Sequence, residues 1–246
     1  MKIFLTFDMD WAIDEVIENT LDIIESENVK ATFFITHETK VLKRLRDNDN
    51  IELGIHPNFN HLITKNVNEH YAQELIEDLK RIVPEAVSVR SHSLFQSSGI
   101  LDLFKKHDFL FDANLFIPYN SSIQLKPMKH WNGLIRVPHF WEDDVFCIER
   151  EKAIYKDWDV SKFLDYKGLK VFDFHPIHVF LNTEHLERYQ NAKSHFKDFS
   201  QLRNYVNNDH KNGSRVFLRN LIKEAKIRGY CFNKISEVEI ENCSDG

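Results

Sequence analysis

Two aspartates follow the first apolar stretch of the chain, and they are the first candidates for chemistry. The run IFLTF at 3–7 ends in Asp8 and Asp10, with Trp11 directly behind them. Side chains two positions apart in an extended chain lie on the same side. We therefore expect both carboxylates to face one cavity, although a turn or a helix N-cap is the alternative role for either aspartate alone.

Ionisable and amide side chains also follow several later apolar runs. They are His56, Asn60 and His61 after 51–55, Arg90 and His92 after 87–89, His139 and the acids at 142–144 after 134–138, and His175 and His178 after 171–174. In parallel α/β folds the carboxyl ends of the strands meet at one edge and carry the chemistry. This concentration of Asp, His and Arg at strand ends predicts a functional site there.

Metal-assisted hydrolysis is the chemistry that such a set supports. A divalent ion takes carboxylate and imidazole ligands and leaves positions for water, whose pKa it lowers. A carboxylate off the metal can accept the water proton, and a histidine on the opposite wall can protonate the leaving group. Taken singly, His56 also suits a structural role, Asn60 a turn and Arg90 an ion pair. His92, His139 and His178 each suit hydrogen bonding or packing.

Strand-length and helix-period segments alternate along the chain. The strand-like runs cover 2–7, 30–36, 51–55, 87–91, 109–115, 134–138, 168–175 and 230–238. Amphipathic stretches cover 12–28, 40–47, 68–83, 99–107, 198–208 and 214–229. This alternation predicts a parallel sheet with helices outside it, either a barrel or a doubly wound sheet. The glycine motifs of nucleotide-binding sheets are missing from the sequence.

Composition favours a globular protein of one domain covering 1–246. The net charge is −6 and no long basic run is present, which argues against nucleic acid as a partner. No segment reaches the ~18–20 apolar residues of a membrane helix. The separated Cys147, Cys231 and Cys243, with no visible signal peptide, predict free thiols and a cytoplasmic location. The irregular segment 115–165 could be a lid or an interface, and the oligomeric state stays open.

Six segments together resemble the polysaccharide deacetylase superfamily, the NodB-homology domain of carbohydrate esterase family 4. They are TFDMD at 6–10, ATFF at 31–34, ELGIH at 52–56, Arg90, VFDFH at 171–175 and FNKISEV at 232–238. The first is similar to the family motif TFDD, with one extra residue between the acids. The resemblance covers nearly the whole chain and implies a distorted β/α barrel of seven or eight strands.

The resemblance also implies a reaction and roles. The family removes N- or O-acetyl groups from sugars with a divalent ion, Zn²⁺ first, with Co²⁺ or Ni²⁺ as alternatives. Carried across by position, Asp8 would be the general base, Asp10 and His56 metal ligands, Arg90 the partner of the base, and His175 the general acid. One carboxylate of 142–144 would orient that acid, and which one stays open.

The second motif departs from the family pattern H-S/T-x-x-H. Asn60 stands where the second histidine is usual, and His61 follows it. Asn60 could be a weak oxygen ligand, a bulge could bring in His61, or two protein ligands could suffice. HPNFN resembles a subgroup linked to surface-polysaccharide gene clusters, which favours Asn60. His92, Trp141 and His178 are the predicted substrate contacts, with His178 also a rival acid.

The sequence therefore predicts a metal-dependent deacetylase acting on an N-acetylated sugar or sugar nucleotide in surface-polysaccharide synthesis. The altered second motif motivates one alternative, an inactive sugar-binding pseudo-deacetylase. A metal amidohydrolase acting on a small non-sugar amide is the other alternative. Trp11, Trp131 and Trp141 suit stacking on a sugar ring and favour the sugar substrate.

Overall fold

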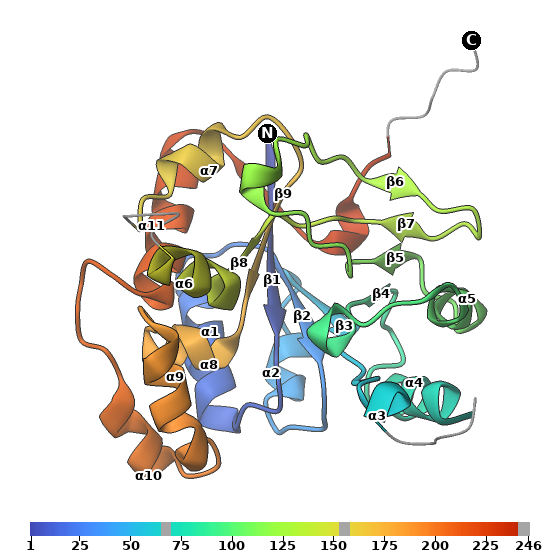
Figure 1. The fold of residues 1–246 in the computed structure, drawn as a ribbon, viewed down its shortest axis with the longest axis horizontal. Helices are drawn as coiled ribbons and strands as arrows, with labels where there is room; N and C mark the ends of the chain where they lie inside the picture. Colours follow the sequence, from blue (N-terminus) through green and yellow to red (C-terminus); the bar gives the residue numbers. More distant parts are fainter. Residues whose placement is uncertain (65–69, 153–157, 241–246) are drawn as a thin grey trace.

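A curled, mostly parallel sheet forms the centre of the molecule (Figure 1). The computed structural model describes residues 1–64, 70–152 and 158–240. The strands are β1 Lys2–Asp8, β2 Ala31–Ile35, β3 Ile51–Ile55, β4 Ser88–Val89, β5 Phe111–Asp112, β6 Met128–Lys129, β7 Ile135–Arg136, β8 Trp141–Glu142, β9 Lys170–Phe174 and β10 Cys231–Asn233. Their order is β6-β7-β5-β4-β3-β2-β1-β9-β8, with β10 beside the first half of β1. Only the β6–β7 pair is antiparallel among these strands.

The sheet curls into a half-barrel, and one buried ion pair shows how strongly it is curved. Arg90 follows β4, yet its guanidinium contacts Asp173 on β9. Strands β4 and β9 are four spacings apart in the sheet order. In a flat sheet that is about 19 Å, beyond the reach of an arginine side chain. The carboxyl ends of these strands therefore close on one another around a common interior.

Helices pack on the outside of the sheet. They are α1 Asp14–Ser26, α2 Leu42–Arg46, α3 His61–Thr64, α4 His70–Ile82, α5 Ser98–Lys106, α6 Asp143–Glu151, α7 Ser161–Asp165, α8 Pro176–Leu181, α9 Leu186–Ala192, α10 Phe199–Leu202 and α11 Ser214–Ile227. In α1 the apolar residues Val16, Ile17, Leu21 and Ile24 share one buried face, as their helical spacing predicts. Figure 1 shows α6, α8, α9 and α11 on one flank and α3, α4 and α5 on the other. None of the helices in the described part of the chain is both long and apolar enough to cross a membrane.

The predicted fold class is confirmed, with additions in the middle of the chain. Each of the eight strand-like runs contains a strand, whereas β6 and β8 lie in no apolar run of strand length and were missed. Helices α3 and α6 to α9 were also missed. Within 115–165, residues 153–157 lie outside the described residues, as do 68–69 of the predicted helix 68–83. Cys147 and Cys231 are free thiols, and Cys243 lies outside the described residues.

The prediction that Trp141 contacts substrate is wrong. Its side chain is 3% exposed, and its ring stacks on Phe217 of α11 at 4.4 Å between centroids. Successive residues of a strand point to opposite faces of the sheet. Trp141 pairs in register with Phe172, whereas Glu142 pairs with Asp173. The aromatic pair therefore faces the helices outside the sheet, and the acidic pair faces the interior of the half-barrel.

Trp141→Ala is expected to lower the free energy of unfolding by about 3–5 kcal/mol, because it leaves a cavity among packed aromatic rings. Trp131→Ala is the matched control, since Trp131 is 76% exposed, and should change the free energy by less than about 0.5 kcal/mol. Urea unfolding of both variants measures the difference. Equal, small effects would contradict the core role of Trp141.

Candidate metal centre and active site

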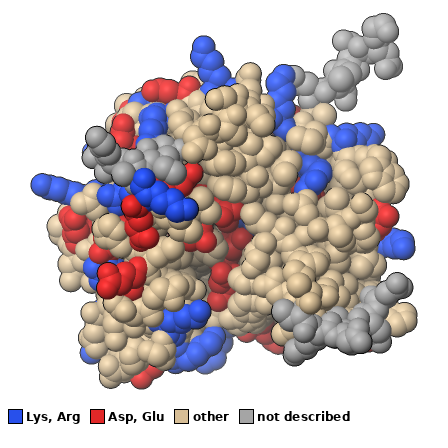
Figure 2. Space-filling view, viewed as in Figure 1, with Lys and Arg blue, Asp and Glu red and all other residues tan. Residues whose placement is uncertain are grey.

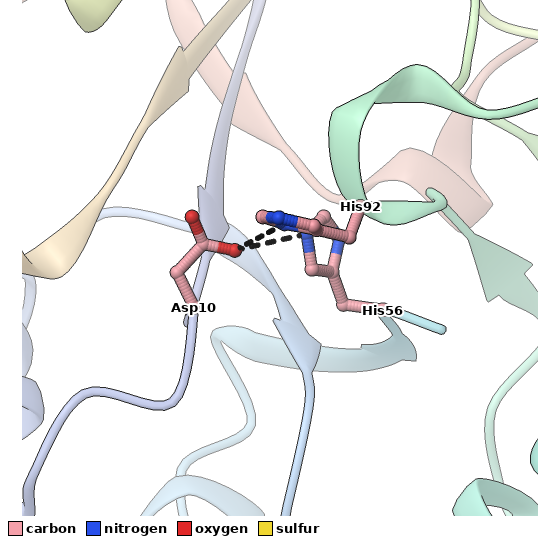
Figure 3. Close-up of side chains that lie close together, drawn as sticks. All are labelled: Asp10, His56 and His92. Carbon is pink, nitrogen blue, oxygen red and sulfur yellow. Dashed lines mark hydrogen bonds and ion pairs between the residues drawn. The ribbon is translucent and has the colours of Figure 1, made fainter. Parts of the chain in front are cut away.

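Three side chains that follow strands β1, β3 and β4 converge at the carboxyl edge of the sheet (Figure 3). Asp10 follows β1, His56 follows β3 and His92 follows β4. Asp10 Oδ1 lies 3.2 Å from His56 Nε2 and 2.9 Å from His92 Nδ1. One ligand atom from each residue lies within 4.8 Å of the others. Figure 2 shows a hollow between the two flanks of helices, with acidic side chains along its wall.

The backbone after β1 aims the Asp10 carboxylate at these rings. Asp10 and Trp11 both adopt left-handed conformations, with φ of 43° and 55°. Such φ values are uncommon for residues other than glycine and often mark functional sites. The sequence argument assumed an extended chain through Asp10, but the chain leaves the extended conformation at that residue. A turn closed by the Ala12 N–H and the Met9 carbonyl, rather than strand periodicity, sets the direction of the Asp10 carboxylate.

The donor set fits a divalent cation of the Zn²⁺, Co²⁺ or Ni²⁺ type. His56 is 2% exposed, and its ring nitrogens lie near Asp10 and Asp8 without meeting hydrogen-bond geometry to any described residue. A buried polar atom without a partner costs about 1–3 kcal/mol, and a bound cation would satisfy it. Burial raises the pKa of Asp10, but His56, His92 and the charge of His175 together hold it well below its ordinary value. A carboxylate and two imidazoles are suitable ligands for these metals.

The geometry favours His92 as third ligand over either candidate in the second motif. The Asn60 side-chain amide donates to Ser93 Oγ at 3.2 Å. The His61 ring packs against Tyr71, with centroids 6.1 Å apart. His92 instead shares the Asp10 and His56 group, because β4 pairs beside β3 and places its carboxyl end next to His56. The sequence assigned His92 to substrate contact, since no spacing rule links residues on two separate strands.

Asp8 faces the same cavity and is held from behind by Arg90. Asp8 is 3% exposed; its Oδ1 accepts a hydrogen bond from the Arg90 guanidinium at 3.0 Å, and its Oδ2 lies 3.5 Å from His56 Nδ1. Arg90 is fully buried and also donates to the Ala113 carbonyl at 3.1 Å. Burial alone would lower the pKa of Arg90, but Asp173 and Asp8 raise it. A permanent positive charge therefore stands behind the Asp8 carboxylate.

Asp173 is a second carboxylate on Arg90 and had no role in the sequence analysis. It pairs with the guanidinium and accepts a hydrogen bond from Thr6 Oγ1 at 2.8 Å. Burial raises the pKa of Asp173 well above its ordinary value, although Arg90 opposes the rise. Burial likewise raises the pKa of the neighbouring Glu142 to about 8. An acid in the middle of the buried run VFDF was the signal that could have found it.

Asp143 orients His175. The carboxylate Oδ1 lies 2.8 Å from His175 Nδ1, and Oδ2 accepts a hydrogen bond from the His175 backbone N–H at 3.1 Å. Burial lowers the pKa of His175, but the charge and hydrogen bond of Asp143 raise it well above its ordinary value. His175 Nε2 lies 3.8 Å from Asp10 Oδ2. The protonated imidazole of His175 is therefore favoured at neutral pH. Its Nε2, the ring nitrogen that does not contact Asp143, faces Asp10.

The other two acids at 142–144 have different partners. Glu142 hydrogen-bonds the His139 ring at 2.5 Å, and Asp144 Oδ1 accepts from the Val145 backbone N–H at 2.6 Å. His178, predicted to contact substrate, is 4% exposed and stacks on Tyr189 at 4.7 Å. Its ring packs edge-on against His175, 5.6 Å away. The described contacts of His178 are therefore with Tyr189, His175 and Thr183, which indicate a packing role beside the candidate acid.

Comparison with known proteins gives the family. A family model for WbmS-like polysaccharide deacetylases matches residues 5–193. The chain belongs to this family. Among WbmS-like relatives of known structure is WbmS of Bordetella bronchiseptica, described as a candidate polysaccharide deacetylase involved in O-antigen biosynthesis. That structure is 41% identical, covers 90% of both chains and has a TM-score of 0.83.

More distant structures share the fold with this WbmS-like chain. A family 4 carbohydrate esterase from Streptomyces lividans, solved with acetate, is 10% identical over 94% of this chain and 91% of its own, with a TM-score of 0.52. A pseudoenzyme of the same esterase family from Bacillus anthracis is 16% identical over 97% of this chain and 64% of its own, with a TM-score of 0.51. A search of curated proteins found no match.

Substitution of the converging residues is expected to distinguish metal ligands from nearby residues that do not bind the metal. His92→Ala, His56→Ala and Asp10→Ala should each lower the affinity for Zn²⁺ at least about 100-fold, because each removes one of three protein ligands. Asn60→Ala and His61→Ala should retain metal, and they are the matched controls on the second motif. Metal content after dialysis and titration with Zn²⁺ measure the effect. Loss of metal in Asn60→Ala with retention in His92→Ala would contradict this ligand set.

Proposed function

We propose that this protein is a metal-dependent deacetylase that hydrolyses the N-acetyl group of an amino sugar or sugar nucleotide. The observation that carries the proposal is that the Asp10, His56 and His92 donor group contacts two paired acid–base residues. Asp8, held by Arg90, lies 3.5 Å from His56, and His175, held by Asp143, lies 3.8 Å from Asp10. Hydrolysis of an amide needs a proton acceptor and a proton donor in this relation.

Each of these side chains has one task in the reaction. A cation held by Asp10, His56 and His92 would polarise the acetyl carbonyl and lower the pKa of the attacking water. Asp8 accepts a proton from that water while Arg90 holds the carboxylate in place. His175 donates the proton on Nε2 to the amine nitrogen as its bond to the carbonyl carbon breaks. The water oxygen ends in acetate, and the amine nitrogen gains a proton. Asp143 stabilises the imidazolium of His175 until that proton leaves.

Two observations support a sugar substrate from surface-polysaccharide synthesis. The chain belongs to a polysaccharide deacetylase family, and WbmS of Bordetella bronchiseptica, 41% identical, is described as involved in O-antigen biosynthesis. A cytoplasmic site of action stays a prediction from the sequence. The likeness to a pseudoenzyme of the esterase family is one of fold alone. The paired Asp8–Arg90 and Asp143–His175 groups favour an active enzyme over a binding module.

The proposal is tested with Zn²⁺-loaded protein and three acetamides: N-acetylglucosamine, its uridine diphosphate conjugate and N-acetylethanolamine. We expect acetate and free amine to appear from at least one sugar and much more slowly from N-acetylethanolamine. Asp8→Asn should lower kcat by about 10²–10⁴-fold while metal stays bound, since it removes the general base. Asp22→Asn, on the exposed surface of α1, is the control. Bound metal without turnover of any acetamide would overturn the deacetylase in favour of a binding module.

Asp143→Asn is expected to change the pH dependence. The charge and hydrogen bond of Asp143 raise the pKa of His175, so their loss lowers that pKa. A general acid must be protonated, and activity is lost as the pH rises through its pKa. The alkaline limb of the kcat profile should therefore move to lower pH, with a fall at alkaline pH of up to about 10²–10⁴-fold.

Asp144→Asn is the matched control for Asp143→Asn, one residue along the same helix. Its carboxylate is hydrogen-bonded to a backbone N–H and acts on His175 only through its charge. We expect a smaller shift of the alkaline limb in the same direction. A kcat profile unchanged in Asp143→Asn would show that His175 is not the acid.

A further inference from the structure

A cavity of about 190 Å³ opens beside the candidate metal centre. Asp10 and His92 form part of its lining, so it is continuous with the place where a substrate carbonyl would be attacked. The remaining wall comes from the β1–α1 turn, α1, α8 and the chain around α9. Its main apolar and aromatic members are Trp11, Ile13, Val16, Ile177, Tyr189 and Phe196.

The cavity is much larger than an acetyl methyl group needs. An apolar cavity of about 150 Å³ can hold a benzene molecule. A methyl group would leave most of the 190 Å³ without contacts, and unfilled space forfeits dispersion energy along its walls. A straight alkyl chain of about four carbons would restore those contacts. Size therefore favours a group longer than the methyl of an acetyl.

The chemistry of the wall favours an alkyl group over a sugar ring. Apart from Asp10 and His92, the polar side-chain groups of the lining are the Trp11 indole N–H, the Tyr189 hydroxyl and the ammonium of the exposed Lys193. A hydroxyl that enters such a cavity without a partner costs about 1–3 kcal/mol. A sugar carries several hydroxyls, and an alkyl chain carries none. Val16 and Ile177, both buried, offer only hydrocarbon surface.

We infer that this cavity receives the acyl chain of the substrate, and that the enzyme hydrolyses longer aliphatic N-acyl groups faster than the acetyl group. The inference rests on the proposed function and extends its substrate class beyond acetyl. With the carbonyl beside Asp10 and His92, the alkyl chain enters the cavity and the amino sugar stays outside it. The same hydrolysis then releases a longer carboxylate and the free amine.

The test uses the Zn²⁺-loaded protein and glucosamine carrying acetyl, propionyl, butyryl or pentanoyl groups on nitrogen. We expect kcat/KM to rise about fourfold for each added methylene until the cavity is filled, the transfer free energy of one methylene. Appearance of free amine measures the rate. A kcat/KM that is highest for acetyl and falls with each added carbon would overturn the inference while leaving deacetylation intact.

Variants that fill the cavity test whether the acyl chain of the substrate binds within it. Val16→Phe and Ile13→Phe should each lower the ratio of butyryl to acetyl turnover at least about tenfold. Ile13 is less buried than Val16, so the second variant remains usable if the first misfolds. Ile227→Phe makes the same kind of change at a position 69% exposed on α11 and should leave the ratio unchanged. An equal loss for every acyl length would mean that another part of the substrate occupies the cavity, and would overturn the inference.

A binding measurement tests whether the cavity binds alkyl chains, independently of turnover. Acetate, butyrate and pentanoate are titrated calorimetrically into the Zn²⁺-loaded protein, with Ile13→Phe alongside. Butyrate and pentanoate should bind more tightly than acetate, and Ile13→Phe should abolish that difference. Equal affinities for the three carboxylates would overturn the inference. Chain-length-dependent binding without hydrolysis of any N-acyl sugar would support the cavity and count against the proposed function.

Discussion

The ion pairs of Arg90 are the constraint on which the rest of the structure depends. A fully buried guanidinium contacts Asp8 from β1 and Asp173 from β9 while following β4 itself. Removal of one partner from a buried ion pair costs about 3–5 kcal/mol, because an uncompensated charge remains in the interior. The half-barrel must therefore stay curled tightly enough for one side chain to bridge its opposite walls. Burial of this charge links the shape of the sheet to the position of the candidate base.

The two acids on Arg90 differ in their surroundings. Asp8 lies at the end of β1, close to the cavity and His56, whereas Asp173 is enclosed with Thr6 and Glu142. Burial raises the pKa values of Asp173 and Glu142, which favours their protonated forms. Arg90 contacts both carboxylates and holds Asp8 in place beside His56, as a positioned proton acceptor requires.

Sequence and structure agree best where one segment carries both the strand and its functional residue. Asp8, Asp10, His56, Arg90 and His175 all lie at the ends of strands that their apolar runs predict, and the structure joins all five through side-chain contacts. The predictions that depended on side-chain direction were less successful. Trp141 points outward because it pairs in register with Phe172, and His178 is covered by Tyr189. The exposure of an aromatic or imidazole ring depends on what packs over it, which composition does not contain.

The sequence by itself determined the parallel sheet, the positions of its main strands along the chain and the edge at which chemistry collects, because hydrophobic periodicity and strand-end polarity are local properties. Tertiary structure alone decided which donors meet. His92 joins Asp10 and His56 because β4 lies beside β3, and Asp143 rather than Glu142 or Asp144 reaches His175. The cavity beside them is likewise bounded by α1 and by α8 and α9, which come much later in the chain. Contacts between distant segments arise from packing and curl, and no short motif encodes them.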